Sequence, residues 1–247
     1  MVRFRIRYEK VGPIRYTSHR DLLRIFRRCL ATADVPVCYS QGFNPHPRMS
    51  FGPSLRTGWE SLDEYLDVLL DRPLDDLTTR CNTALPEGIE ILEWAQAETS
   101  VPKLSVDVMA ARYEVTVDAA NLAPESNPEW TDFVTRAQAN GHTGKWLLAE
   151  LEDDLQRRFP SGAASVDGGA GPSLLEIHVD EQGDGLRIEY LSTMHQGKGI
   201  FPDVLEPYFG NPDGMAVPLQ VVRKALFVAR RGAFLSPINK GVVQNLL

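Results

Sequence analysis

Residues 2–10 read V-R-F-R-I-R-Y-E-K, and their alternating pattern is the starting point for the predicted fold. Apolar residues at positions 2, 4, 6 and 8 alternate with arginines at 3, 5 and 7, which predicts a β-strand with one apolar face and one arginine face. A Gly-Pro pair at 12–13 ends the strand. Ser18, with Asp21 three residues later, has the spacing of a helix cap and predicts a helix to about residue 33.

The predicted helix has two different faces. At about 100° per residue, its apolar side chains fall on one side: Leu22, Phe26, Cys29, Leu30 and Ala33. Four arginines gather on the opposite side: Arg20, Arg24, Arg27 and Arg28. We expect the apolar face to pack on a sheet, with Cys29 as a core residue. The four guanidinium groups, called the basic helix face below, are then left in solvent.

Further elements of the first half are strands near 48–51, 64–70 and 89–94 and a helix over 74–85. The resulting β-α-β-β-α-β order is that of a ferredoxin-like domain, which we place at residues 1–98. Such a sheet has both helices on one face, so Arg3, Arg5 and Arg7 are expected on the open face. Asp67 would neutralise Arg5 if the two lie side by side there.

The second half repeats this order loosely after a connector at 95–111. Strands are expected at 112–119, 175–179, 186–190 and within 217–228; helices are expected from 127, over 146–159 and over 201–209. A Gly-rich loop occupies 161–172. We predict an α+β protein of two tandem ferredoxin-like (βαββαβ) domains, the second at 110–247, diverged and with an inserted helix.

The composition is that of a folded, soluble protein. Of 247 residues, 43% are hydrophobic and 24% are charged, which separates the chain from disordered proteins. No run of about 18 apolar residues occurs, so no membrane contact is expected. The charged N-terminus is unlike a secretory signal, and three cysteines are too few and too irregularly spaced for a disulfide framework. These features favour a cytoplasmic location.

The net charge of −7 conceals an uneven distribution. Residues 1–58 have a balance of +8, whereas the rest of the chain has −15. Ten of the eleven basic residues in 1–58 are arginines, whose planar guanidinium suits phosphate and stacks on bases. Two interpretations stay open: this segment contacts nucleic acid, or it docks on the acidic part of its own chain.

Two polar clusters lie in this basic region. The first leads into the helix N-terminus, where unpaired backbone N–H groups favour anions. The second is a Gly/Pro-rich loop with aromatic residues that can stack on bases, and its prolines restrict the backbone around His46. We predict that both clusters form one nucleotide-binding pocket from these residues: Arg15, Tyr16, Ser18, His19, Arg20, Tyr39, Ser40, Gln41, Phe43, Asn44, His46 and Arg48.

Simpler roles stay open for several of these residues. Ser18 and Asp21 can serve only to cap the helix, His19 can form a local hydrogen bond, and Phe43 can anchor its own loop. The sequence lacks the motifs of P-loop NTPases, serine hydrolases and zinc proteases. Its five histidines lack metal-ligand spacing, so we expect no metal and no cofactor.

Three motifs carry a resemblance: G-P-I-R-Y-T-S-H-R-D-L (12–22), Y-S-Q-G-F-N-P-H-P-R-M-S-F-G (39–52) and G-W-E-S…E-Y-L-D-V (58–68). On these motifs the chain resembles the radical-SAM-associated family. Its members are small proteins of unknown function found beside, or fused to the end of, a radical S-adenosylmethionine (SAM) protein. Residues 192–203 match the Gly-rich turn of that family only loosely. No C-x-x-x-C-x-x-C occurs, so the resemblance implies a separate radical SAM protein as partner.

A second resemblance is one of topology alone. The predicted pair of ferredoxin-like domains is similar to the architecture of CRISPR repeat-processing endoribonucleases, and a shared fold does not imply a shared function.

The leading hypothesis is a non-catalytic RNA- or nucleotide-binding accessory protein that presents substrate to a radical SAM enzyme, in RNA or ribosome modification. One alternative is metal-independent RNA cleavage, with His19 and His46 as the acid–base pair. Another is a pure protein-interaction module that binds the radical SAM enzyme through the basic helix face.

Overall fold

The computed structural model describes residues 1–97, 101–118, 135, 145–160, 172–182, 185–195, 197–209, 219–230, 233–238 and 242–245. The chain divides into two compact units, Met1–Ala110 with Arg223–Leu247 and Ala111–Val222. The sequence placed the second domain at 110–247, whereas the structure groups the last segment with the first unit. Within the described residues, no helix has the length and apolar character needed to cross a membrane.

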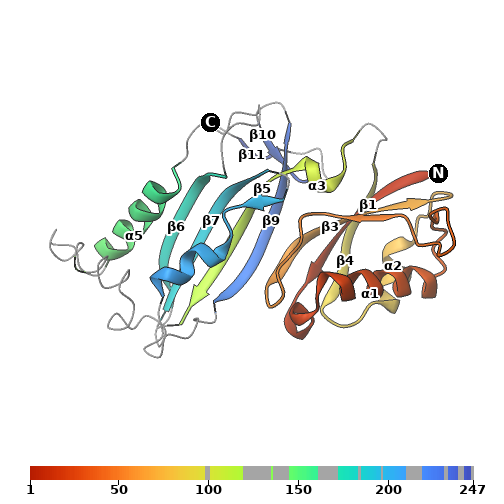
Figure 1. Cartoon of the computed structure of the whole chain (residues 1–247), viewed down its shortest axis with the longest axis horizontal. Helices are drawn as coiled ribbons and strands as arrows, with labels where there is room; N and C mark the ends of the chain where they lie inside the picture. Colours follow the sequence, from red (N-terminus) through yellow and green to blue (C-terminus); the bar gives the residue numbers. More distant parts are fainter. Residues whose placement is uncertain are drawn as a thin grey trace. The chain divides into compact units, whose positions relative to one another are not determined.

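The first unit is built on an antiparallel sheet (Figure 1). The strand order is β4-β1-β3, and β2 pairs with β3. In chain order the elements are β1 (Val2–Lys10), the 3-10 helix η1 (Gly12–Tyr16), α1 (His19–Thr32), β2 (Met49–Phe51), β3 (Glu60–Leu70), α2 (Leu77–Ala84) and β4 (Ile89–Ala97). These strands and α-helices follow one another in the order that the sequence predicted.

One face of this sheet forms the core of the first unit. Phe4, Ile6 and Tyr8 of β1 pack with side chains from α1, α2, β3 and β4, so both helices cover the same face. Helix α1 begins after Ser18, whose side chain accepts the backbone N–H of Asp21 at 3.2 Å. Its apolar face is buried as predicted, through Leu22, Phe26, Cys29 and Leu30.

The C-terminal segment completes the first unit. From Arg223 onward, β9 (Gln220–Arg230) lies next to β3 in the sheet. Strand β10 (Ala233–Leu235) pairs with β9 and with β11 (Val242–Asn245). A one-turn helix, α3 (Leu104–Asp107), follows β4. Strand pairing over such sequence separations is set by packing, which local sequence patterns do not report.

The second unit has the strand order β5-β7-β6. Its described elements are β5 (Val108–Val117, which enters the unit at Ala111), α5 (Lys145–Arg158), β6 (Leu174–Gln182), β7 (Gly185–His195), β8 (Lys198–Gly199) and the 3-10 helix η4 (Pro202–Tyr208). Of the helix expected from 127, the structure describes only residue 135, which is helical, and of the Gly-rich loop expected at 161–172 it describes only residue 172. The chain is thus a mixed α+β protein, as predicted, and strands outnumber helices among the described residues.

Candidate functional site

Arg5, in the middle of the arginine face of β1, is buried, and Arg3 and Arg7 are partly buried, which corrects the expectation that this face is open. Arg5 is 2% exposed and binds Asp67 through Nε–Oδ1 (2.8 Å) and Nη2–Oδ2 (3.0 Å) contacts. Its remaining N–H groups donate to Asp107 Oδ2 (3.2 Å), the Pro237 carbonyl (3.2 Å) and the Pro102 carbonyl (3.3 Å). All five N–H groups of this guanidinium are used inside the protein, which leaves none for a ligand.

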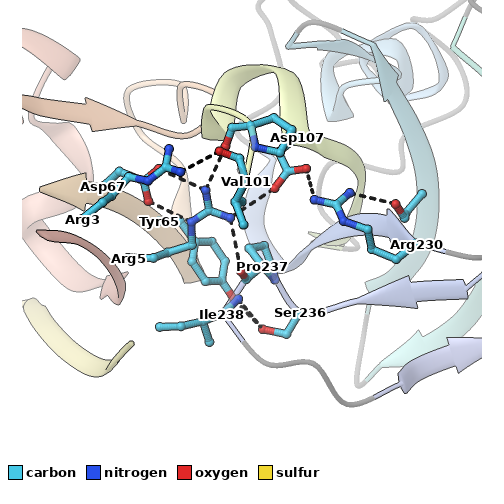
Figure 2. A network of polar contacts seen from close by, with 12 residues as sticks. Arg3, Arg5, Tyr65, Asp67, Val101, Asp107, Arg230, Ser236, Pro237 and Ile238 are labelled. Atoms are coloured by element: carbon cyan, nitrogen blue, oxygen red, sulfur yellow. Dashed lines mark hydrogen bonds and ion pairs between the residues drawn. The ribbon is translucent and has the colours of Figure 1, made fainter. Parts of the chain in front are cut away.

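Figure 2 shows how this network extends from β1 to the C-terminal segment. The carboxylate of Asp107 also pairs with Arg230 of β9, and Arg3 donates to the Val101 carbonyl at 2.7 Å. A cavity of about 200 Å³ beside the network is lined by residues of β4, β9 and the segment 235–238. Ion pairs link Asp67 to Arg5, Arg5 to Asp107, and Asp107 to Arg230 in turn. We interpret this network as a structural one that holds β1, β3, α3 and β9 together.

Burial and charge pairing both shift the pKa values of these groups. Burial lowers the pKa of Arg5, but the hydrogen bonds and charges of Asp67 and Asp107 raise it by more, so the net shift is upward. Arg7 donates from Nε to Asp63 Oδ1 at 2.6 Å. Burial raises the pKa of Asp63 above its ordinary value, against the opposing effects of its hydrogen bonds and of Arg7.

Arg15 lies in η1 and already has a carboxylate partner. Its Nη1 donates to Glu60 Oε1 at 2.7 Å, and the same oxygen accepts the backbone N–H of Gly12 at 3.0 Å. The guanidinium Cζ lies 5.0 Å from the centroid of the Tyr16 ring, a cation–π geometry. Arg15 is partly exposed and Tyr16 is exposed. A phosphate at Arg15 would have to compete with the Glu60 carboxylate.

His19 packs against β2 at the start of α1. Its ring lies edge-on to Phe51, with centroids 5.3 Å apart. Together with Tyr8, Lys10 and Glu64 it lines a cavity of about 10 Å³, the volume occupied by a single water. Ser18 acts as the helix cap, as its simpler interpretation required.

Sequence reasoning missed the buried charged side chains behind this cavity. Lys10, 2% exposed, donates to the carbonyls of Arg15 (3.1 Å) and Thr17 (3.0 Å), and Glu64 pairs with Arg223 at 2.9 Å. Burial lowers the pKa of Lys10 and raises the pKa of Glu64. Lys10 therefore holds the η1 turn in place. The available signal was a charged residue inside an otherwise apolar strand pattern.

Residues 39–48, called the aromatic loop below, form an ordered turn. Tyr39 makes a β-bridge with Pro47. The Ser40 N–H donates to the His46 carbonyl (2.9 Å), the His46 N–H donates to Ser40 Oγ (3.0 Å), and the Arg48 N–H donates to the Cys38 carbonyl (2.8 Å). The predicted binding residues of this loop are all exposed: Tyr39, Ser40, Gln41, Phe43, Asn44, His46 and Arg48.

The two polar clusters have separate surroundings. His19 lies against Phe51, which pairs with Leu66 of β3, whereas the aromatic loop joins β3 where the Leu69 N–H donates to the Arg48 carbonyl (3.0 Å). Three strand residues, about 10 Å, separate these two points of attachment. Within the described part of the chain, no hydrogen bond or ring contact joins His19 to His46. The cavity beside His19 is not lined by His46.

The basic helix face is accessible. Arg20, Arg24 and Arg28 are exposed and Arg27 is half-buried. Arg24 pairs with Asp21 at 3.0 Å, but no described carboxylate pairs with Arg20, Arg27 or Arg28. With a rise of about 1.5 Å per residue, Arg20 and Arg28 are about 12 Å apart along the helix axis. This spacing offers cations to more than one phosphate of a chain.

Internal pairing accounts for part of the +8 balance of residues 1–58. Arg5, Arg7, Arg15 and Arg24 each have a carboxylate partner. Arg20, Arg27, Arg28 and Arg48 have none among the residues that the structure describes. In the same part of the chain, no three or more His, Cys, Asp or Glu side chains gather as metal ligands.

Comparison with known proteins gives a family and distant structural likenesses. Two solved structures with low similarity are an unknown protein from Galdieria sulphuraria (15% identity, 83% of this chain and 84% of that chain, TM-score 0.24) and Thermus thermophilus Cse3 bound to an RNA representing a pre-cleavage complex (14% identity, 90% and 99%, TM-score 0.25). No curated protein matches the chain. Residues 3–159 match the family model described as "Uncharacterized protein conserved in bacteria (DUF2344)". The chain therefore belongs to the DUF2344 family.

Proposed function

We propose that this chain is a non-catalytic RNA- or nucleotide-binding accessory protein that acts with a separate radical SAM enzyme, in RNA or ribosome modification. The observation that carries the RNA-binding part is the basic helix face. It presents Arg20 and Arg28 in solvent, each without a described carboxylate partner. The radical SAM partner rests on the family resemblance of the motifs at 12–22, 39–52 and 58–68.

The placement of charge favours a polyanion as ligand. Guanidinium groups bind phosphate through two parallel N–H···O contacts, and surface arginines without carboxylate partners are available for this. Arg24 is also exposed, and its pair with Asp21 is a surface ion pair, which contributes little and exchanges readily. The aromatic loop adds Arg48 as another exposed cation. The proposed surface is thus the basic helix face together with the aromatic loop.

The nuclease alternative has less support. General acid–base cleavage of RNA requires both imidazoles within reach of one scissile phosphate. His19 packs on Phe51 beside a cavity of about 10 Å³, and His46 belongs to the separate aromatic loop. For the fold, we propose two tandem ferredoxin-like domains. The element order of the first unit supports this proposal, and so does the looser repeat of that order in the second half of the sequence.

The test is a salt titration of RNA binding by the full chain. Fluorescence anisotropy of a labelled RNA oligonucleotide would be measured between about 50 and 200 mM salt. We expect affinity to fall as salt rises, with a log–log slope that decreases by about 0.7 for each phosphate contact removed. The double variant Arg20→Gln/Arg28→Gln should show a slope reduced by about 1.4.

Arg80→Gln provides the matched control. Arg80 is an exposed arginine of α2 with an Asp76 partner at 2.7 Å, so its loss should leave the slope unchanged. Absence of RNA binding, or an identical slope in the double variant and the unsubstituted protein, would overturn the proposal. Capture of the radical SAM enzyme by a protein that binds no RNA would instead favour the interaction-module alternative.

A further inference from the structure

The aromatic loop has an ordered base and an exposed tip. Its base is closed by the Tyr39–Pro47 bridge and by the reciprocal contacts of Ser40 and His46. At the tip, Gly42 has φ +134°, a backbone conformation that favours glycine. A loop held in this way loses little conformational entropy when a ligand binds.

Phe43 is fully exposed at this tip. The core of the first unit does not include it, and no ring contact involves it among the described residues. The alternative that Phe43 anchors its own loop is therefore wrong, because the ring packs on nothing within the described structure. Tyr39 of the same loop is 49% exposed. A large apolar side chain held in water on an ordered loop is unfavourable for the free protein, which points to a role in binding.

We propose that the aromatic loop is a stacking platform for unpaired nucleotide bases, so that the RNA bound by this protein is single-stranded. This inference rests on the proposed function and specifies its ligand class. The Phe43 ring stacks on a base and Tyr39 offers a second aromatic surface. Arg48, exposed and without a described carboxylate partner, binds the adjoining phosphate.

Charge and geometry both favour single-stranded RNA as the occupant. The loop follows α1 by a short connection, in which the Val35 N–H donates to the Leu30 carbonyl (3.0 Å) and the Cys38 N–H donates to the Leu69 carbonyl (2.8 Å). The aromatic loop therefore lies at the C-terminal end of the basic helix face. Bases inside a duplex already stack on each other and do not present their faces to a side chain.

The chemistry of the tip also predicts a sequence-tolerant site. A Cβ added at Gly42 would meet nothing within 4 Å, so the space beside Phe43 is open. A ring in open space stacks on any base because every base has a π face. We therefore expect little preference among bases of similar stacking strength.

The experiment compares single-stranded and duplex RNA of one sequence, with 2-aminopurine as the reporter base. With the full chain, we expect at least about tenfold tighter binding of the single strand, with a change in 2-aminopurine fluorescence on stacking. Phe43→Leu should weaken single-strand binding by about tenfold and abolish the fluorescence change. Phe43→Trp should restore both. Thermal melting should be the same for all three proteins, because the ring is exposed.

The outcomes separate this inference from the proposed function. Equal affinity for single strand and duplex, with a salt slope that still responds to Arg20→Gln/Arg28→Gln, overturns the stacking platform and keeps the RNA-binding proposal. Loss of all RNA binding in the unsubstituted protein overturns both. Unchanged RNA binding in Phe43→Leu, with lost capture of the radical SAM enzyme, assigns the loop to protein binding and overturns the inference.

Discussion

Arg5 and Asp107 are 102 residues apart in the chain, yet Nη1 of Arg5 lies 3.2 Å from Oδ2 of Asp107. Asp67 of β3 holds the same guanidinium from the side, and Arg230 of β9 binds the same carboxylate of Asp107. The arginine face of β1 therefore joins the N-terminal sheet to α3 and to the C-terminal strands. It is a structural feature of the first unit and not a surface for a ligand (Figure 2).

Substitution of Arg5 should strongly destabilise the protein. Arg5→Met leaves the buried carboxylates of Asp67 and Asp107 without this partner, and breaking a buried ion pair from one side costs about 3–5 kcal/mol. Urea denaturation would measure the free energy of unfolding. Arg24→Met is the control, because its surface pair with Asp21 contributes about 0.5 kcal/mol or less. Similar losses of unfolding free energy in the two variants would contradict a structural role for the Arg5 network.

Gly88 should tolerate no side chain. It has φ +87°, and a Cβ at this position would lie 2.3 Å from the Val11 carbonyl oxygen. Gly88→Ala combines backbone strain with a clash and should lower the free energy of unfolding by about 3 kcal/mol. Gly42→Ala is the control: its φ is also positive, but nothing lies within 4 Å, so about 1 kcal/mol is expected. A larger loss of unfolding free energy in Gly42→Ala than in Gly88→Ala would contradict the close approach of Gly88 to Val11.

The helix cap should be visible in the titration of Asp21. The Ser18 hydroxyl donates to Asp21 Oδ2 at 2.7 Å and, with a smaller effect of Arg24, holds the pKa of Asp21 below its ordinary value. A carboxylate with a lowered pKa stabilises the fold at neutral pH, and this contribution is lost as pH falls below about 4. NMR titration of Ser18→Ala should show the Asp21 pKa rising toward its ordinary value, and Arg24→Gln should raise it less. If the pKa of Asp21 is unchanged in Ser18→Ala, the hydrogen bond from Ser18 is not what lowers it.

Cys38 should react slowly with thiol reagents. Burial raises the pKa of its thiol, and Asp71, which accepts the Sγ–H at 2.9 Å, raises it further. A higher pKa leaves less thiolate at a given pH, and the thiolate is the reactive form. Asp71→Asn should therefore speed alkylation of Cys38 near pH 8, followed by mass spectrometry. Asp75→Asn, an exposed acid nearby in the chain, is the control. An equal rate in the two variants would count against the carboxylate effect.

Local sequence signals predicted much of the first unit. The alternation in residues 2–10 predicted β1, and the Ser18 cap with the apolar positions of the helix predicted α1 and its buried face. These features depend on neighbours within four residues, so a single sequence contains the information needed. The exposure of the basic helix face follows from the same periodicity.

The candidate site was less predictable because its parts depend on contacts across the fold. Arg15 and Arg28 are equivalent in a count of charge, yet Glu60 pairs with Arg15 and no described carboxylate pairs with Arg28. Likewise, His19 and His46 are both near arginines in the sequence, but one packs on Phe51 and the other belongs to the aromatic loop. Composition reports how many charges a segment has and not which partners neutralise them.

The local pattern of residues is enough to assign an apolar and a cationic face to both β1 and α1, because side-chain direction follows from backbone periodicity. Whether a cationic face is then buried or exposed depends on which distant segments pack against it. Residues 101–107 and the return of the chain from Arg223 cover the face of β1, while the basic helix face stays in solvent. A guanidinium can be buried only where carboxylates and carbonyls from distant segments lie at hydrogen-bond distance, and the fold as a whole determines whether these partners are there.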